Sequence, residues 1–248
     1  MYGLKLSLVT IVYNAQDTIG QCIESVISQN YPDLEYIIID GGSTDNTVEV
    51  IKKYLPSINI LVSEPDNGIY DAMNKGIKLA TGQIVGTLNA DDRFADHEVL
   101  QTVAKAFEQQ GADAVYGDLD IVDKKNRIVR KWRSGQWRGS SFNLGFMPPH
   151  PTFYCRRRLF EKFGFYSLDF GSAADYELML RFMYGHKINS IYLKKVMVKM
   201  RTGGVSSKNL TNRIRAWQYD LKAMQKNKIR LPLVTLMLKP FRKIFQFI

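Results

Sequence analysis

Two neighbouring carboxylates, Asp91 and Asp92, follow an apolar run in the stretch GTLNADDRF. Adjacent carboxylates repel each other, and burying them without a compensating cation is costly. The apolar run, residues 84–88, has the composition of a buried strand that stops at Asn89. The two carboxylates therefore either lie in solvent where a strand ends, or bind a positively charged group.

The first 120 residues around this pair alternate between β-rich runs and helical patterns. We expect strands at Leu6–Tyr13, Glu35–Asp40, Ile58–Ser63, Gln83–Leu88 and Ala114–Asp118, with helices near 17–29, 46–54, 69–80 and 97–110. This alternation predicts an α/β fold with a mostly parallel sheet and helices on both faces. Further along we expect a hairpin at 115–130, a helix from Asp175 to about Tyr184, and a mostly helical segment from about 208.

Polar clusters follow four of these strands. They are Tyr13 and Asn14, then Asp40 in DGGSTD, then the stretch SEPDNGIYDAMNKG, and lastly NADD. Ligands on parallel sheets bind beyond the carboxyl ends of the strands. One such cluster would be an ordinary loop, but four at the same edge predict a binding site.

The basic charge of the chain is confined to its end. The formal net charge is +10, and from Arg201 onward eleven Lys or Arg accompany one acid, Asp220, so the body is neutral. The two cysteines show no metal-ligand spacing, which favours a reducing cytoplasm. We expect neither a signal peptide nor a membrane-spanning segment, because no apolar run approaches the length of about 18 residues that a span needs.

Several motifs together resemble a known family. SLVTIVYN, IIIDGGSTDNT, GIYDAMNKG with ATG, LNADD and ADYELMLR occur in the order typical of family 2 glycosyltransferases with the GT-A fold. The similarity covers about residues 1–205 and is closest to bacterial enzymes that build surface polysaccharides or glycolipids. It implies a catalytic domain at 1–207, with a donor nucleotide-binding half at 1–118 and an acceptor half at 119–207. Residues 208–248 would form a basic amphipathic helical tail.

The resemblance implies that a nucleotide-sugar donor, usually a UDP-sugar, binds the first half of the chain. Asn14 is one of the residues predicted to contact this donor. Asp40 matches the carboxylate that accepts a hydrogen bond from the base, and Tyr13 would stack on the pyrimidine. The alternative for Asp40 is that it merely caps its turn, as Asx residues often do. In the loop after the third strand, Asp66, Asp71 and Lys75 are predicted donor contacts, and each could equally be structural.

The resemblance also implies that Asp91 and Asp92 bind a divalent metal ion, Mg²⁺ or Mn²⁺. Such an ion neutralises the negative charge of the leaving diphosphate. By resemblance Asp92 is the metal ligand, and Asp91 faces the ribose or shares the metal. Family members often have Asp where this chain has Asn89, so we expect a reduced affinity for the metal. A contact of Lys75 or of an arginine with the diphosphate is then expected to contribute more to donor binding. The alternative is a solvated acidic loop.

Asp175 of ADYELMLR matches the catalytic base of an inverting transfer. Such a transfer is a single in-line displacement, so the acceptor hydroxyl must lose its proton as it attacks the anomeric carbon. Helical spacing puts Asp175 on the inward, apolar face, whereas Glu177 precedes Arg181 by four residues, as in a surface ion pair. The family usually has Glu where this chain has Ala174. The alternative is that Asp175 is only an N-cap.

Three further residues are weaker candidates. His150 in PPHPTFY would contact the diphosphate or the metal, or else would pack within its loop. Trp132 and Trp137 would stack on an acceptor sugar, or could equally anchor a loop.

The tail combines apolar and basic residues. Its helical stripe consists of Val234, Met237, Phe241, Ile244, Phe245 and Ile248. Pro240 should kink or split this helix. The combination predicts binding to an anionic membrane surface and a lipid-linked acceptor, and so a peripheral enzyme on the cytoplasmic face. The alternative is that the stripe packs on the body or on another subunit.

Three other functions were weighed. A nicotinamide dehydrogenase would carry G-x-G-x-x-G after the first strand, and this chain does not. A nucleic-acid-binding module would use the basic tail with Trp217 and Tyr219, but nucleic acid would not explain the apolar stripe. A non-catalytic nucleotide-sugar sensor is disfavoured because Asp92 and Asp175 are both present. We therefore predict a glycosyltransferase that acts on a glycan or lipid-linked acceptor.

Overall fold

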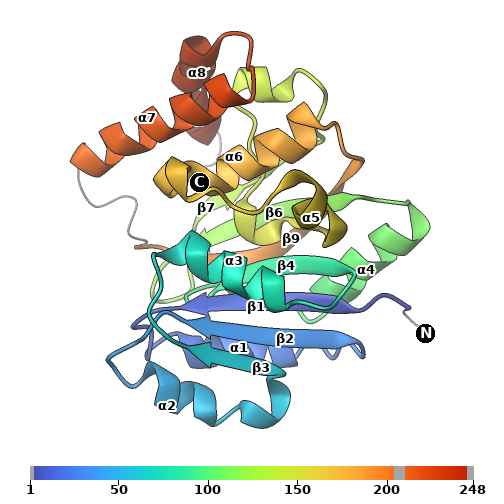
Figure 1. The fold of residues 1–248 in the computed structure, drawn as a ribbon, viewed down its shortest axis with the longest axis vertical. Coiled ribbons are helices and arrows are strands. Elements are labelled where there is room, and N and C mark those ends of the chain that lie inside the picture. The colour runs from blue at the N-terminus through green and yellow to red at the C-terminus, as the bar shows by residue number, and fades with distance from the viewer. Residues whose placement is uncertain (1–2, 204–209, 245–248) are drawn as a thin grey trace.

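The computed structural model describes residues 3–203 and 210–244 (Figure 1). The strands are β1 (Leu6–Val12), β2 (Leu34–Asp40), β3 (Ile60–Ser63), β4 (Ile84–Asn89), β5 (Arg93–Phe94), β6 (Ala114–Val122), β7 (Ile128–Trp132), β8 (Tyr154–Arg156) and β9 (Ser190–Arg201). The α-helices are α1 (Ile19–Ile27), α2 (Thr47–Lys52), α3 (Ile69–Leu79), α4 (Val99–Gln109), α5 (Arg158–Phe163), α6 (Ala174–Met179), α7 (Leu210–Lys226) and α8 (Pro232–Ile244). Short 3₁₀ turns η1 (Leu55–Ser57), η2 (Ser141–Leu144), η3 (His150–Thr152) and η4 (Leu168–Ala173) and a π-helical segment η5 (Leu180–Gly185) complete the described elements.

Within the described residues, nine strands form one sheet in the order β3-β2-β1-β4-β8-β6-β9-β5, with β7 paired to β6. The first four strands in this order run parallel. β8 is antiparallel to both β4 and β6, so β6 points the same way as β4. The carboxyl ends of β1, β2, β3, β4 and β6 therefore share one edge of the sheet.

The predicted α/β fold is confirmed. The first four strands and the first four helices lie within two residues of their predicted bounds, and the hairpin forms as β6 and β7. β6 extends to Val122, so the predicted boundary between the two halves, at 118, falls inside a strand. Both halves contribute strands to the same sheet.

The sheet is buried on both faces, and its central strands are mostly apolar on both sides. In β1, Val9 packs toward α3 and Leu8 packs toward α1. Helix α3 approaches β1 closely at Gly76, where an added Cβ would lie 2.2 Å from Cγ1 of Val9. The N-terminus of α3 thereby lies near the edge that carries the strand ends.

Helices α6 and α7 lie on the same side of the sheet as α3 (Figure 1). The helix predicted from Asp175 begins at Ala174 and becomes π-helical after Met179. Helix α7 packs on η4 and α6, and it buries Ala223 and Met224 in the core. The predicted tail is thus part of the folded body where the structure describes it.

Helix α8 runs through Pro240 without a break, so the prediction of two shorter segments is wrong. A proline removes one N–H donor from the helix, and a helix can continue at that cost. Phe245 and Ile248 of the predicted stripe lie outside the described residues. Among the described helices, none is long and apolar enough to cross a bilayer.

Candidate active site

Tyr13 stands exposed at the end of β1. Its side chain is 63% accessible. Asn14 has a left-handed backbone (φ 46°), and its Oδ1 accepts a hydrogen bond from the backbone N–H of Thr44 at 2.8 Å. The Asn14 N–H in turn donates to Ser43 Oγ at 2.8 Å. These hydrogen bonds connect the turn after β1 to the loop after β2. The exposed Tyr13 ring is accessible for stacking with a planar ligand.

Asp40, at the end of β2, is fully buried. Its carboxylate accepts hydrogen bonds from the N–H and Oγ of Ser43 and, at 2.7 Å, from Ser63 Oγ. Asp40 therefore caps the DGGSTD turn, which is the alternative that the sequence left open. Its role as a ligand of the base stays a prediction, because the carboxylate is closed off in this conformation.

The loop after β3 uses its own polar groups internally. Asp66 accepts from the Gly68 N–H at 2.7 Å, and Asp71 accepts from the Asn67 N–H at 3.0 Å. Lys75 pairs with Glu64 at 2.9 Å and also donates to the Pro65 carbonyl. Asp66, Asp71 and Lys75 thus shape this loop, and their contact with a donor stays a prediction.

The two acidic residues after β4 differ sharply in accessibility. Asp91 is exposed, whereas Asp92 is only 1% exposed. Asp92 Oδ2 accepts from Asn89 Nδ2 at 3.1 Å, and its Oδ1 has no hydrogen-bond partner among the described residues. Burial, together with the nearby Asp91 charge, raises the pKa of Asp92 well above its usual range. Asp91 is therefore the carboxylate that solvent can reach in this structure. The assignment of Asp92 as the metal ligand, with Asp91 at the ribose or sharing the metal, stays a prediction.

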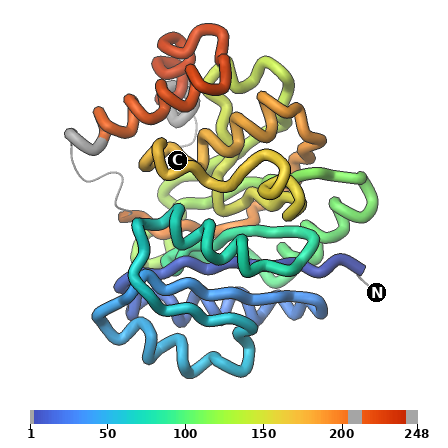
Figure 2. Tube along the Cα trace, viewed as in Figure 1, coloured from blue at the N-terminus to red at the C-terminus, as the bar shows by residue number. Residues whose placement is uncertain are grey.

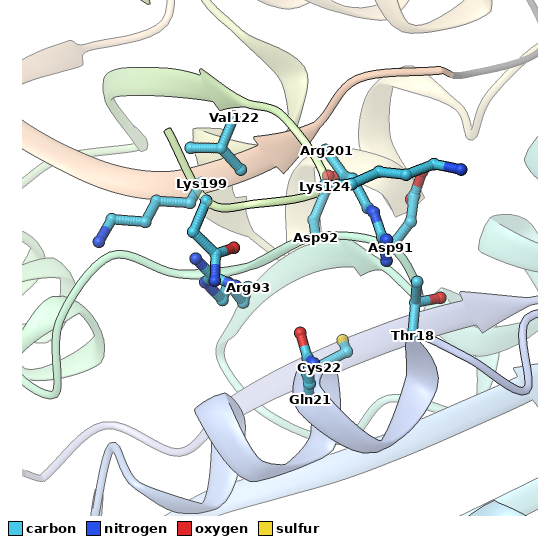
Figure 3. A pocket seen from close by; sticks show the side chains of 11 residues that line it. Thr18, Gln21, Cys22, Asp91, Asp92, Arg93, Val122, Lys124, Lys199 and Arg201 are labelled. Atoms are coloured by element: carbon cyan, nitrogen blue, oxygen red, sulfur yellow. The ribbon is translucent and has the colours of Figure 1, made fainter. Parts of the chain in front are cut away.

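Both acids line a small cavity of about 70 Å³ (Figure 3). The cavity lies between α1, the β6–β7 hairpin and the end of β9, and basic side chains from these last two segments border it: Lys124, Lys199 and Arg201. Arg201 is near enough for its charge to act on Asp91. Sequence reasoning missed Arg201, which it counted only as the first base of the tail. Its place at a strand end was the signal available.

The acid pair suits a hard divalent cation in the chemistry of its donors. Asp91 offers exposed carboxylate oxygens, and Asp92 has a buried oxygen without a partner. Among the described residues, no group of three or more His, Cys, Asp or Glu side chains is arranged so that it could hold a metal ion by itself. The pair therefore fits a cation that takes its remaining ligands from a bound diphosphate.

Asp175 lies in the first turn of α6 and is partly buried. The N-cap of this helix is Ala173, so the N-cap alternative is wrong, although Asp175 Oδ1 does accept from the Tyr176 N–H at 2.7 Å. The Asp175 charge acts on three neighbouring rings, those of Tyr70, His150 and Tyr166. Asp175 therefore faces a cluster of aromatic side chains.

This aromatic cluster joins the two halves of the chain. His150 Nε2 and Tyr166 Oη lie 2.7 Å apart, and the Tyr70 and Tyr166 rings are 5.5 Å apart. Asn74 Nδ2 donates to the Tyr166 carbonyl at 2.9 Å, while Asn74 Oδ1 accepts from the Tyr166 N–H at 3.0 Å. Burial lowers the pKa of His150, and the Asp175 charge opposes that shift. His150 is thus a packed loop residue beside Asp175, and its contact with a diphosphate stays a prediction.

Glu177 forms the predicted ion pair with Arg181, at 3.0 Å, but the pair is not on the surface. Glu177 is fully buried because α7 covers it, and Lys226 of α7 adds a second contact at 3.1 Å. Burial alone would raise the pKa of Glu177, but Arg181 and Lys226 outweigh it and hold the pKa below its usual range. Arg181 also donates to the carbonyls of residues 163–165.

The two tryptophan candidates lie in different elements, because Trp132 ends β7 and Trp137 lies in the loop that follows. The Trp137 ring packs near Phe142, and its backbone N–H donates to Tyr116 Oη at 2.7 Å. The Arg130 guanidinium lies over the Trp132 ring, with its Cζ 5.2 Å from the ring centroid. Stacking of either ring on an acceptor sugar stays a prediction.

The sequence matches the family described as Glycosyl transferase family 2 over residues 7–172. A PGL/p-HBAD biosynthesis glycosyltransferase of Mycobacterium bovis is 29% identical over 217 residues, which cover 84% of this chain and 81% of that protein. An uncharacterized glycosyltransferase of Mycobacterium tuberculosis is 32% identical over 212 residues, covering 82% of this chain and 77% of that protein.

Solved structures share the fold. The mannosyltransferase PcManGT from Pyrobaculum calidifontis, in complex with GDP-Man and Mn²⁺, has a TM-score of 0.68 and 20% identity, over 96% of this chain and 70% of that chain. A UDP complex of S. aureus TarS has a TM-score of 0.66 and 17% identity, over 96% of this chain and 68% of that chain. A longer TarS structure has a TM-score of 0.67 and 19% identity, and this chain matches 39% of it with 90% of its own length.

Proposed function

Because this chain belongs to glycosyl transferase family 2 and is a glycosyltransferase with the GT-A fold, we propose that it moves a sugar, with inversion, from a UDP-sugar to an acceptor hydroxyl. One observation carries the mechanism. The Asp175 charge acts on Tyr70, which lies in the first turn of α3, and Tyr70 Oη donates to the Ser172 carbonyl at 3.4 Å. The carboxylate is therefore held near the edge where the strand ends present Tyr13 and Asp91.

Tyr13 supports binding of the donor nucleotide. Its exposed ring lies at the end of β1, where a pyrimidine could stack on it, and base–aromatic stacking contributes about 1–3 kcal/mol. The fold neighbours hold UDP, UDP-GlcNAc or GDP-Man. We propose a uridine nucleotide as the donor, because the single pyrimidine ring of uracil is similar in size to the phenol ring of Tyr13 on which it would stack.

Asp91 would hold the divalent cation, Mg²⁺ or Mn²⁺, with Asp92 behind it. When bound, this cation neutralises the charge that develops on the leaving diphosphate. Asn89 keeps Asp92 in place through its amide N–H and so supports the pair without contributing charge. Arg201 adds a fixed positive charge on the same side, which favours binding of the diphosphate.

Asp175 acts as the general base. The acceptor oxygen attacks the anomeric carbon, its proton passes to Asp175, and the bond from that carbon to the phosphate oxygen breaks, so that UDP leaves with the bonding pair. Burial first, and then the Asp175 charge, raise the pKa values of Tyr70 and Tyr166, so both phenols stay protonated beside the base. The acceptor that we propose is a hydroxyl of a glycan or of a lipid-linked sugar.

A panel of nucleotide sugars tests this proposal. Release of UDP should require one donor, an acceptor fraction and Mn²⁺ or Mg²⁺, and it should stop on chelation. Asp175→Asn should still bind the donor in calorimetry but transfer about 10²- to 10⁴-fold more slowly. Donor binding without any release by the wild type would instead indicate a non-catalytic sensor and overturn the proposal.

A further inference from the structure

Helix α8 has two faces of opposite character. On its inner face Thr235 is fully buried and donates to the Asn143 carbonyl at 2.8 Å. One turn later, Lys239 pairs with Asp220 at 2.7 Å and lies 3.6 Å from the centroid of the Tyr176 ring. These contacts hold α8 to α7 and α6, so Lys239 is not available to a partner.

The outer face of α8 carries apolar side chains in solvent. Leu233 and Met237, one turn apart, are 63% and 71% exposed, and Val234 between them is also exposed. At 100° per residue these three positions lie opposite Thr235 and Lys239. Leu144 of η2, which packs beside α8, is exposed as well. Single exposed apolar residues are common on proteins, but a contiguous group marks an interaction surface.

Exposed basic residues lie on the helix that packs against α8 and on the connection that leads into it. Exposed bases outside the described ion pairs are Arg213, Arg215, Lys228 and Arg230, whereas the exposed Lys222 and Lys226 bind the Asp169 carbonyl and Glu177. The one acid within residues 210–244 is Asp220, and Lys239 neutralises it. Apolar side chains flanked by uncompensated positive charge match the interface of an anionic bilayer, where acyl chains lie beneath anionic headgroups.

We propose that the outer face of α8, with the bases of α7, docks this enzyme on an anionic lipid surface. A second copy of the chain would bring the same positive charge against itself. Nucleic acid would account for the bases and leave Leu233, Val234 and Met237 unexplained. The body does not cover this face, because α8 already packs through the opposite one. A peripheral position on the cytoplasmic leaflet, which is rich in anionic lipid, follows.

The docking face is connected to the catalytic helix. Helices α7 and α8 form one end of the molecule, and η1 and α2 lie at the other (Figure 2). Tyr219 of α7 packs over Gly171 in η4, the segment that leads into Asp175. A bilayer at α8 would therefore present a lipid-linked acceptor on the Asp175 side. This consequence rests on the proposed function, whereas the docking itself does not.

Co-sedimentation of the full chain with vesicles tests the proposal without donor or acceptor. The wild type should sediment with phosphatidylcholine vesicles that contain phosphatidylglycerol, and should release at high salt. Leu233→Glu and Met237→Glu should each weaken binding by about tenfold or more. Arg230→Gln should weaken it about fivefold, as expected for one charge near an anionic surface. Leu55→Glu, which alters an exposed leucine of η1, is the matched control and should bind like the wild type.

Four outcomes would overturn the docking proposal. The first is a wild type that stays in the supernatant with anionic vesicles. The second is equal vesicle binding by Met237→Glu and Leu55→Glu. The third is a Met237→Glu variant that converts a dimer into a monomer in light scattering. The fourth is tight oligonucleotide binding that is insensitive to Met237→Glu, without vesicle binding. Release of UDP in lipid-free solution should be the same in Leu233→Glu and wild type, which separates failed docking from failed catalysis.

Discussion

Asp175 and Glu177 are two residues apart on one helix, and the structure predicts opposite consequences of neutralising them. Glu177→Gln leaves Arg181 buried without its carboxylate. Breaking a buried ion pair costs about 3–5 kcal/mol. Arg181 keeps its bonds to the carbonyls of residues 163–165, and glutamine remains an acceptor, so the lower end applies. At a urea slope of about 3 kcal/mol per M, the unfolding midpoint should fall by about 1 M.

Asp175→Asn should behave in the reverse way. No charged partner holds Asp175 in any ion pair of the described residues, so the free energy of unfolding should change by less than about 1 kcal/mol. Its turnover should fall about 10²- to 10⁴-fold. Urea denaturation and UDP release per folded molecule, measured on both variants, separate the two roles. Equal loss of turnover in folded Glu177→Gln would refute the assignment of the base.

The pH dependence of stability gives an independent check on Glu177. Its folded-state pKa lies below the unfolded value of about 4.3, so its carboxylate stabilises the fold above that pH. This contribution is lost as the pH falls through the folded-state pKa. The difference in unfolding free energy between wild type and Glu177→Gln should be constant near neutral pH and shrink below about pH 4. A difference that grows in acid would contradict the buried ion pair.

Three other predictions follow from the described contacts. Tyr13→Ala should weaken UDP-sugar binding in calorimetry by about 5- to 150-fold, the equivalent of one lost stacking contact, and unchanged affinity would exclude stacking. Asp91→Asn should raise the Mn²⁺ concentration for half-maximal UDP release by about tenfold or more, and an unchanged titration would exclude Asp91 as a ligand. Glu35 is buried, and although burial opposes the shift, bonds from Ser7, Thr81 and Lys5 lower its pKa to about 2. Glu35→Gln should therefore cost about 3 kcal/mol of unfolding free energy at pH 7 and little at pH 2, whereas a pH-independent cost would contradict the shift.

Local patterns in the sequence were sufficient for the scaffold. The strand and helix periods placed the first four strands and helices, since an apolar run in a parallel sheet and an amphipathic helix each have their own spacing. The polar residue after each strand predicted a candidate site at one edge of the sheet, because parallel strands end at the same edge. The ordered motifs also identified the family, which the match over residues 7–172 confirms.

Tertiary packing decided which of the candidate side chains a ligand can reach. Asp91 and Asp92 are adjacent in sequence, yet only Asp91 is exposed, because the turn after β4 directs Asp92 inward to Asn89. Asp40 is closed off by Ser43 and by Ser63 of the neighbouring strand. A local pattern contains no information on burial by a segment that lies far along the chain.

The surroundings of Asp175 and the exposed face of α8 depended wholly on long-range contacts. Helical spacing paired Glu177 with Arg181 but placed the pair at the surface, because the helix that buries it starts some 30 residues later, at Leu210. The same spacing marked an apolar stripe on the tail. Only the packing of Thr235 and Lys239 against η2, α7 and α6 shows which face remains free. Periodicity defines the faces of a helix, and the neighbours that the fold brings to it determine which face is covered.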